Sequence, residues 1–254
     1  LGSGHDAMQG ARLGPGFSDT TIRQLLDRRG VPYRTFEEHD LARAVARWIA
    51  DGKVVGWFQG RMELGPRALG GRSIIGDPRN EDMQSVMNVK VKFRESFRPF
   101  APAVLAEDAQ KYFDIKQPSP YMLLVAPVTA DQRRAVPPEA SGRTGLELLK
   151  TIRSTIPAVT HVDHSARVQT VGPEAEPRYR ALLEEFRSLT GCPVLINTSF
   201  NVRGEPIVHT PDEAYTCFMR TDIDILVLGS AVLHKEDQPP WAEDTDWRTE
   251  IPLD

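Results

Sequence analysis

Arginines and glycines are interspersed between residues 61 and 79, and together they could bind an anion. Glycine allows backbone N–H groups to turn inward at positive φ, and arginine offers a planar fork of donors that matches phosphate bidentately. The segment holds four of each, namely Arg61, Arg67, Arg72, Arg79, Gly65, Gly70, Gly71 and Gly76. It therefore indicates a phosphate-binding loop, for which a glycine-rich surface loop with solvated charges is the alternative.

A second basic group follows at once. Lys90, Lys92 and Arg94 alternate with apolar residues. Arg98 then begins an apolar segment bounded by prolines. A strand over 89–94 would place its bases on one face, and a helix would still bring Lys90 and Arg94 together. Any one of these residues could belong to a solvated surface, but as a set, so close behind the arginines, they favour a binding role.

Short polar side chains follow an apolar segment at 193–196 and make a third candidate group. It consists of Asn197, Thr198, Ser199, Asn201 and Arg203. Amides, hydroxyls and a guanidinium can donate to phosphate oxygens or to a planar amide. Ser199 lacks the GxSxG context of a serine nucleophile. Binding is therefore the favoured role, and a polar turn that caps the next element is the alternative.

The segment 158–171 alternates apolar and polar residues, as a half-exposed strand does. This alternation would put His161, Asp163 and Arg167 on one face and His164 on the other. A metal site that joins both histidines is therefore disfavoured, and no metal site is expected in this chain. Arg167 could serve as a further anion contact, whereas an ordinary ion pair on a half-exposed strand is the alternative.

Alternating helix and strand patterns must position these groups. Helices are expected at 20–29, 40–50, 81–87, 177–189 and 211–218, and strands at 54–58, 98–105, 121–128, 193–196 and 223–228. The first strand leads directly into the arginine and glycine segment, and loops at strand ends are where α/β folds usually bind ligands. We expect an α/β fold in which 130–143 is an exposed loop or insertion.

Composition restricts the function. The chain has 254 residues, 40% of them hydrophobic, and a net charge of −4. Its basic residues are thus a local feature of a mildly acidic protein, which favours a small anionic ligand over nucleic acid. No apolar run approaches the roughly 20 residues of a membrane span, and the N-terminus lacks a signal-peptide core. A cytoplasmic location without membrane contact is expected. The cysteines, Cys192 and Cys217, lack zinc spacing.

Three blocks of the sequence resemble the C-terminal half of the O-carbamoyltransferases of the NodU and TobZ type, which modify antibiotics and nodulation factors. The blocks are 60–73 (GRMELGPRALGGRS), 92–102 (KFRESFRPFAP) and 195–201 (LINTSFN), and the segment 161–169 agrees with them. The resemblance covers residues 13–235. Residues 1–12 are expected to be a linker or a cloning remnant, and residues 236–254 an acidic tail.

The resemblance implies a YrdC-like domain, which is a twisted open mixed α/β sheet with flanking helices. It implies that this domain makes carbamoyl adenylate from carbamoyl phosphate and ATP, with Mg²⁺ as a companion of the nucleotide. It also implies a separate N-terminal metal-binding domain that transfers the carbamoyl group to a hydroxyl acceptor. That domain is expected to be absent from this chain and to be its partner in the full-length protein.

The resemblance also implies roles for individual residues. The catalytic group would be Lys92, Arg98, Arg167 and Ser199, the substrate-binding group Arg67, Arg72, Asn197 and Asn201, and the nucleotide-binding group Thr198 and Arg203. Two alternatives stay open. One is a threonylcarbamoyl-adenylate synthase of the broader YrdC kind, and the other is a non-catalytic module that binds nucleotide or docks a partner.

Overall fold

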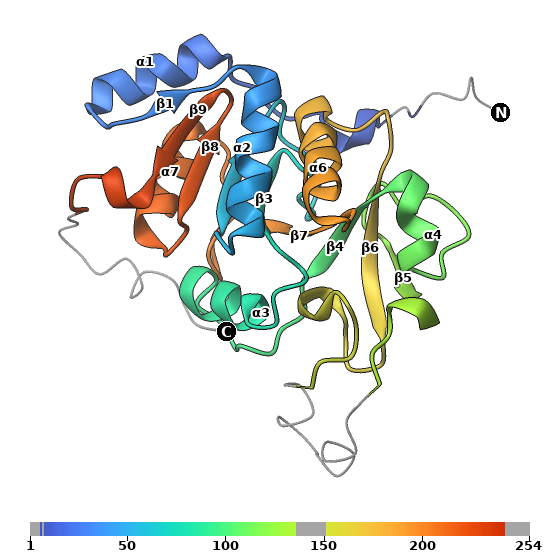
Figure 1. The fold of residues 1–254 in the computed structure, drawn as a ribbon. Coiled ribbons are helices and arrows are strands. Elements are labelled where there is room, and N and C mark those ends of the chain that lie inside the picture. Colours follow the sequence, from blue (N-terminus) through green and yellow to red (C-terminus); the bar gives the residue numbers. More distant parts are fainter. Residues whose placement is uncertain (1–5, 7, 136–150, 242–254) are drawn as a thin grey trace.

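The computed structural model describes residues 6, 8–135 and 151–241, and one open mixed sheet forms its centre (Figure 1). The strands are β1 (Arg34–Thr35), β2 (Val55–Phe58), β3 (Arg72–Gly76), β4 (Ala101–Leu105), β5 (Leu124–Pro127), β6 (Ser165–Val171), β7 (Val194–Ser199), β8 (Ile225–Leu228) and β9 (Ala231–His234). Their order is β1-β9-β8-β2-β3-β7-β4-β6-β5. The pairs β2/β8 and β4/β6 are parallel, and the other neighbours are antiparallel.

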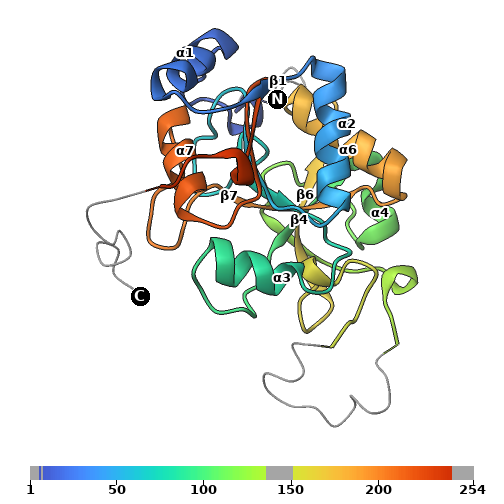
Figure 2. The ribbon, with the colours of Figure 1, turned by 60° about the vertical axis from the view of Figure 1, so that its left-hand side comes forward.

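Helices lie on both sides of this sheet. The longer ones are α1 (Asp19–Arg29), α2 (Glu38–Ala50), α6 (Pro177–Thr190) and α7 (Pro211–Arg220), and the short ones are α3 (Met83–Val86) and α4 (Ala109–Tyr112). A π-helical turn, Met87–Val91, extends α3, and 3₁₀ turns occur at Gln9–Ala11, Ala106–Asp108, Ala130–Gln132, Pro157–Val159 and Lys235–Asp237. Figure 2 shows α1 and α7 on one side of the sheet and α2 and α6 on the other.

Local sequence explains where the longer helices begin and end. Ser18 accepts the N–H of Thr21 at the start of α1, and Gly30 ends that helix in the left-handed region at φ 63°. The side chains of Glu176 and Thr210 cap α6 and α7 in the same way. These caps satisfy N–H groups that have no partner inside a helix.

The middle of the sheet is buried, and its register brings together the segments that carry the candidate residues. Strands β2, β3 and β4 are buried along their whole length. Asn197 on β7 lies opposite Ala101 on β4, and Ala103 on β4 lies opposite Gln169 on β6. Directly opposed residues of neighbouring strands share a face. Asn197 at the end of β7, Ala101 and Ala103 of β4 and Gln169 of β6 therefore share one face.

The predicted fold class, a twisted open mixed α/β sheet with flanking helices, is confirmed (Figure 1). The helices expected at 20–29, 40–50, 177–189 and 211–218 are α1, α2, α6 and α7. The basic segment at 89–94 forms no strand. Residues 89–91 belong to the π-helical turn, and residues 92–94 lie outside any helix or strand, so the helical alternative holds only for the first part. Strands β1, β3 and β9 had not been predicted. Their sequences are short, and β3 falls within the segment interpreted as a loop.

The prediction of one continuous strand over 158–171 is wrong. Pro157–Val159 is a 3₁₀ turn, and β6 begins only at Ser165. The N–H of His164 donates to the carbonyl of His161, and His164 adopts a φ of 61°. Residues 161–164 therefore form a turn. The prediction that His161 and His164 lie on opposite faces assumed a strand, and that assumption does not hold. Residues 136–143 of the expected loop, residues 242–254 of the expected tail, and residues 1–5 and 7 lie outside the described residues.

Candidate functional site

A carboxylate inside the arginine and glycine segment takes the N–H groups that had been predicted to bind phosphate. Glu63 is 4% exposed, and its Oε1 accepts the N–H of Leu69 and the N–H of Gly71, each at 2.6 Å. The N–H between them, from Gly70, donates to Oγ of Ser73. The prediction that the backbone of this loop cradles a phosphate is therefore wrong for residues 69–71.

Side chains from three strands hold the carbonyl groups of the same loop. Trp57 on β2 donates from Nε1 to the carbonyl of Gly70 at 2.9 Å. Gln169 on β6 donates to the carbonyl of Leu69 at 3.0 Å, and Asn197 on β7 donates to that of Ala68 at 3.0 Å. Because the N–H groups of 69–71 and the carbonyls of 68–70 are all bonded, this part of loop 63–71 is held in place on the sheet and is not a flexible ligand cradle.

Three of the four arginines in the segment are used structurally. Arg61 donates to the carbonyls of Leu13 and Gly14, and Arg79 forms an ion pair with Asp77 at 2.6 Å. Arg72 is fully buried, and its guanidinium lies 3.5 Å from the centre of the Phe58 ring. That guanidinium donates to backbone carbonyls, those of Pro15, Gln59, Gly60 and Gly71. The position of Arg72 thus gives no support to its predicted role in binding substrate.

The fourth arginine, Arg67, lines a cleft of about 140 Å³ between loop 63–71 and the end of β7. Side chains that had been predicted to bind phosphate, from three separate parts of the sequence, meet here. The residues that line the cleft are Pro66, Arg67, Ala68, Arg94, Pro99, Phe100, Ala101, Met122, Arg167, Asn197, Thr198 and Ser199.

Three guanidinium groups converge on this cleft, and in the described part of the chain none of them forms a salt bridge. The Nε atoms of Arg67 and Arg167 are buried and have no hydrogen-bond partner. Arg94 donates to the neutral side-chain oxygen of Asn88 at 2.6 Å. The neighbouring carboxylate of Glu95 instead pairs with Arg98 at 2.9 Å and Arg203 at 3.7 Å.

The pKa values of two of these arginines are lowered, and neighbouring positive charge is one of the causes. Burial, together with the charge of Arg67, lowers the pKa of Arg167. Burial, and next the charge of Arg98, lowers the pKa of Arg94 to about 10. The charge of Glu95 acts against this lowering at Arg94. Arg67 and Arg167 are half-buried, and among the described residues no carboxylate pairs with either of them. Their mutual repulsion is what an anion from outside the chain would relieve.

The amide of Asn197 adds an acceptor to this cationic cleft. Its side chain is 1% exposed, and Nδ2 donates to the carbonyl of Ala68 and to Oε1 of Gln169. Its Oδ1 is buried without a partner. A ligand that carries both phosphate oxygens and an N–H group would satisfy the arginines and this oxygen together.

A buried lysine braces the end of β7 from behind. Nζ of Lys92 lies 2.5 Å from the carbonyl oxygen of Ser199 and 2.7 Å from Oδ1 of Asn201. Ser199 donates its hydroxyl to the same Asn201 oxygen at 2.7 Å. Burial, and next the charge of Arg94, lowers the pKa of Lys92 to about 7. Lys92 does not line the cleft. It holds in place Ser199, which does.

The structure therefore divides the ten predicted residues into groups. Arg67, Arg167, Asn197, Thr198 and Ser199 line one cleft. Lys92 and Asn201 stand directly behind it. Arg98 and Arg203 lie next to it, paired with Glu95, and the N–H of Arg203 donates to the carbonyl of Lys92. Arg72 lies apart.

Three further residues had been assigned no individual role. Arg94 had been predicted only as a member of the basic group, and Glu63 and Gln169 had not been predicted. Arg94 lines the cleft, and Glu63 and Gln169 hold loop 63–71. All three fall within the sequence segments that carry the family resemblance, so the signal was present. Their residue types alone could not distinguish them, because an arginine in a basic run and a carboxylate in a polar loop are ordinary surface residues.

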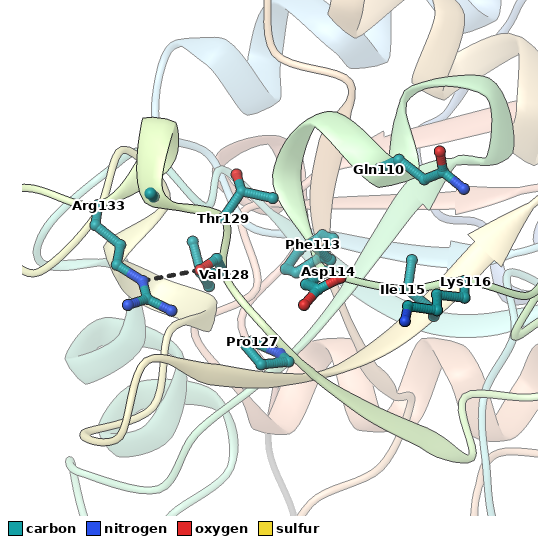
Figure 3. Close-up of a pocket in the computed structure, with 10 residues that line it drawn as sticks. Gln110, Phe113, Asp114, Ile115, Lys116, Pro127, Val128, Thr129 and Arg133 are labelled. Carbon is teal, nitrogen blue, oxygen red and sulfur yellow. Dashed lines mark hydrogen bonds between the residues drawn. The ribbon is translucent and has the colours of Figure 1, made fainter.

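Cavity size alone does not mark the site. A larger cavity of about 590 Å³ lies beside β5, with Lys116 and Arg133 at opposite sides (Figure 3). Arg133 donates to the carbonyl of Val128, and no residue of the predicted set lines this cavity. We therefore place the candidate site in the smaller cleft, where unpartnered charged groups converge.

The described residues hold neither a cluster of metal ligands nor a helix suited to a membrane. Within residues 8–135 and 151–241, no three or more His, Cys, Asp or Glu side chains form a cluster suited to a metal ion. Nδ1 of His161 is within 3.2 Å of Oγ of Ser165, and neither His161 nor His164 lines the cleft. Within the same residues, no helix has the length and apolar character needed to cross a membrane.

Comparison with known proteins gives one matching family. Residues 46–235 match the family described as "Carbamoyltransferase C-terminus". The chain is 58% identical to an uncharacterized protein, sll1178, of Synechocystis, over 98% of this chain and 41% of that protein. It is 41% identical to nodulation protein NolNO of Sinorhizobium fredii, over 91% of this chain and 31% of that protein.

The chain spans about two fifths or less of the length of these relatives. Nodulation protein U of Rhizobium tropici shows the same relationship, with 41% identity over 68% of this chain and 26% of that protein. Among solved structures, full-length HypF in its phosphate- and nucleotide-bound form is similar with a TM-score of 0.48 and 18% identity, over 75% of this chain and 25% of that chain. A similarity of that size assigns no site residue.

Proposed function

Because the chain belongs to the carbamoyltransferase C-terminus family, we propose that its cleft binds carbamoyl phosphate and makes carbamoyl adenylate with ATP. Membership of the family relates the chain to carbamoyl chemistry, and the adenylate step is the proposal. One observation supports it most. Arg67, Arg94 and Arg167 converge without carboxylate partners on a cleft that also holds the unpartnered Oδ1 of Asn197.

The proposed substrate matches this set of groups. Carbamoyl phosphate joins a phosphate to a planar amide, so its oxygens can accept from the three guanidiniums while its N–H donates to Asn197. The size also agrees. Pockets for drug-sized ligands measure about 300–1,000 Å³, and a cleft of about 140 Å³ suits a much smaller anion. The adenosine of ATP would then lie outside this cleft.

The proposed reaction has two steps. Water displaces phosphate from carbamoyl phosphate and gives carbamate. A carbamate oxygen then attacks the α-phosphorus of ATP, the bond to the bridging oxygen breaks, and pyrophosphate leaves with the electron pair. Both steps gather negative charge on phosphoryl oxygens, and fixed cations stabilise such charge without a covalent step by the protein.

Each residue has a role in this proposal. Arg67, Arg94 and Arg167 hold phosphoryl oxygens, and Asn197 orients the carbamoyl group. Thr198 supplies a hydroxyl donor at the end of β7, and Ser199, held by Lys92, lines the cleft beside it. Arg98 and Arg203 lie beside the cleft, where a longer phosphate chain could reach them. Mg²⁺ would arrive with the nucleotide, since the described residues offer no carboxylate cage.

The whole reaction needs more than this chain. Its relatives carry at least half their length outside the matched region, and we propose that this remainder holds the metal-binding domain that passes the carbamoyl group to a hydroxyl acceptor. We place the reaction in the cytoplasm, where ATP is supplied. An antibiotic or a nodulation factor is the acceptor class that the family resemblance suggests.

The decisive experiment is an assay of pyrophosphate release by the purified chain with Mg²⁺ and ATP. Release that depends on carbamoyl phosphate, and that is lost in Arg167→Ala, would support the proposal. Release with threonine and bicarbonate in place of carbamoyl phosphate would favour the threonylcarbamoyl-adenylate alternative. Binding of both ligands without any release would show that the chain alone is a binding module.

A further inference from the structure

We propose that Glu63 is a positioning residue that holds Arg67 in the cleft and thereby sets the affinity for the anion. This inference rests on the proposed function for its ligand, but its evidence is the geometry of loop 63–71. Glu63 does not line the cleft, so any effect on the ligand must pass through the loop.

The carboxylate of Glu63 is the centre around which the loop turns. Its Oε1 receives two N–H groups at 2.6 Å, from Leu69 and Gly71, and the side chain is almost fully buried. Hydrogen bonds to an ionised acceptor are shorter and roughly twice as strong as neutral ones. Leu69 lies two residues after Arg67, so this contact fixes the chain immediately next to the arginine.

The loop has little freedom to compensate if this contact is lost. Gly70 lies against the buried ring of Tyr179, and a Cβ at Gly70 would overlap that ring. The carbonyls of Ala68 and Leu69 are bonded to Asn197 and Gln169. A shift of the part of the loop nearest Glu63 would therefore move Arg67.

A neutral side chain cannot reproduce this arrangement. Glutamine could place its oxygen where Oε1 accepts the N–H groups of Leu69 and Gly71, but it loses the negative charge that strengthens both bonds and puts an NH₂ group in place of Oε2. The guanidinium of Arg72 stands close enough that the charge of Glu63 raises the pKa of that arginine against the larger lowering by burial. Loss of the carboxylate would thus remove a negative charge that favours the charged form of Arg72.

The test is a double-mutant cycle on the whole chain, with inorganic phosphate as the probe and calorimetry as the readout. The variants are Glu63→Gln, Arg67→Ala and the two combined, measured at a low temperature at which each is folded by circular dichroism. Asp224→Asn is the matched control, because Asp224 also accepts a backbone N–H, that of Val54 at 2.8 Å, but does not contact the loop.

We expect Glu63→Gln and Arg67→Ala each to weaken phosphate binding about tenfold, in line with the loss of one charged hydrogen bond. If Glu63 acts through Arg67, the double variant should bind no more than about twofold worse than Arg67→Ala alone. Asp224→Asn should leave the affinity unchanged. Should Glu63→Gln not fold, Glu63→Asp takes its place, since it keeps the charge and shortens the reach.

Two results would overturn the inference. One is wild-type affinity in Glu63→Gln when Arg67→Ala has lost affinity, and the other is multiplication of the two effects in the double variant. Absence of phosphate binding by the wild-type chain would overturn both this inference and the proposed site. If the cycle behaves as expected but no pyrophosphate is released, only the adenylate step fails.

Discussion

The side-chain amides of Asn197 and Gln169 form a hydrogen bond of 2.6 Å that sets the orientation of both. Gln169 donates its own N–H to the carbonyl of Leu69, so its Oε1 is the end that faces Asn197. Asn197 must then present Nδ2 to Gln169 and to the carbonyl of Ala68, which leaves Oδ1 unpartnered. The loop that carries Arg67 and the amide that would read the carbamoyl group are therefore parts of one network.

Replacement of Asn197 by aspartate should weaken anion binding. In Asn197→Asp a carboxylate oxygen replaces the donor that meets Gln169 and Ala68, and negative charge enters the phosphate cleft. We expect phosphate affinity, measured by calorimetry at pH 8, to fall at least about tenfold. Asn80→Asp adds the same charge at an exposed residue and should change it little. Equal losses in both variants would show that only net charge matters.

Arg167 should lower the stability of the unliganded protein and raise its affinity for phosphate. Its buried Nε has no partner, and Arg67 repels it. In Arg167→Gln we expect the free energy of unfolding in urea to stay the same or rise by up to about 1 kcal/mol, and phosphate affinity to fall about tenfold or more. Arg187→Gln removes an arginine that pairs with Asp108 at 2.7 Å, and should keep the affinity. A clear loss of stability in Arg167→Gln would assign that residue a structural role.

Local pattern was enough to predict much of the fold. Capping by Ser18, termination by Gly30 and the spacing of Leu41, Val45 and Ile49 each depend on residues within one helix, and they gave α1 and α2. The residues that meet at the cleft were also named from sequence, since Arg67, Arg167, Asn197 and Ser199 lie together. Their roles in binding stay predictions.

Sequence could not predict whether a given long side chain lines the cleft or bonds to other parts of the protein, because that depends on contacts between distant segments. Arg67 and Arg72 have the same type and lie five residues apart, yet one lines the cleft and the other binds backbone carbonyls. Sequence likewise gave no sign that Glu63 would take the N–H groups of its own loop. Arg94 lines the cleft while Arg98, four residues later, pairs with Glu95.

Lys92 should make stability depend on pH. Its pKa is lowered to about 7 in the folded protein and is about 10.4 in the unfolded chain. Between these values the unfolded state binds the extra proton, so the free energy of unfolding should rise with pH. The difference between wild type and Lys92→Met in urea unfolding should therefore shift in favour of wild type from about pH 7 to pH 10. Lys90→Met, at an exposed residue, should give a constant difference. A constant difference for Lys92→Met as well would mean that its amine keeps an ordinary pKa.

Arg72→Lys should distinguish a structural arginine from a substrate contact. The guanidinium of Arg72 donates to carbonyls of Pro15, Gln59, Gly60 and Gly71, and it stacks on Phe58. A lysine ammonium has neither the reach of the planar fork nor its flat face, and each buried carbonyl that loses its donor costs about 1–3 kcal/mol. We expect urea unfolding to show a loss of about 2–4 kcal/mol, and Arg47→Lys, at an exposed residue of α2, to change stability by less than about 0.5 kcal/mol.

The same Arg72→Lys protein, kept folded at low temperature, should bind phosphate almost as wild type does, because Arg72 does not line the cleft. The opposite pattern, unchanged unfolding with lost phosphate binding, would restore the role in substrate binding that the sequence had predicted. Loss of both would place Arg72 beside Glu63 among the residues that hold loop 63–71 and, through it, Arg67. The two measurements together therefore separate a contact with the ligand from support of the loop.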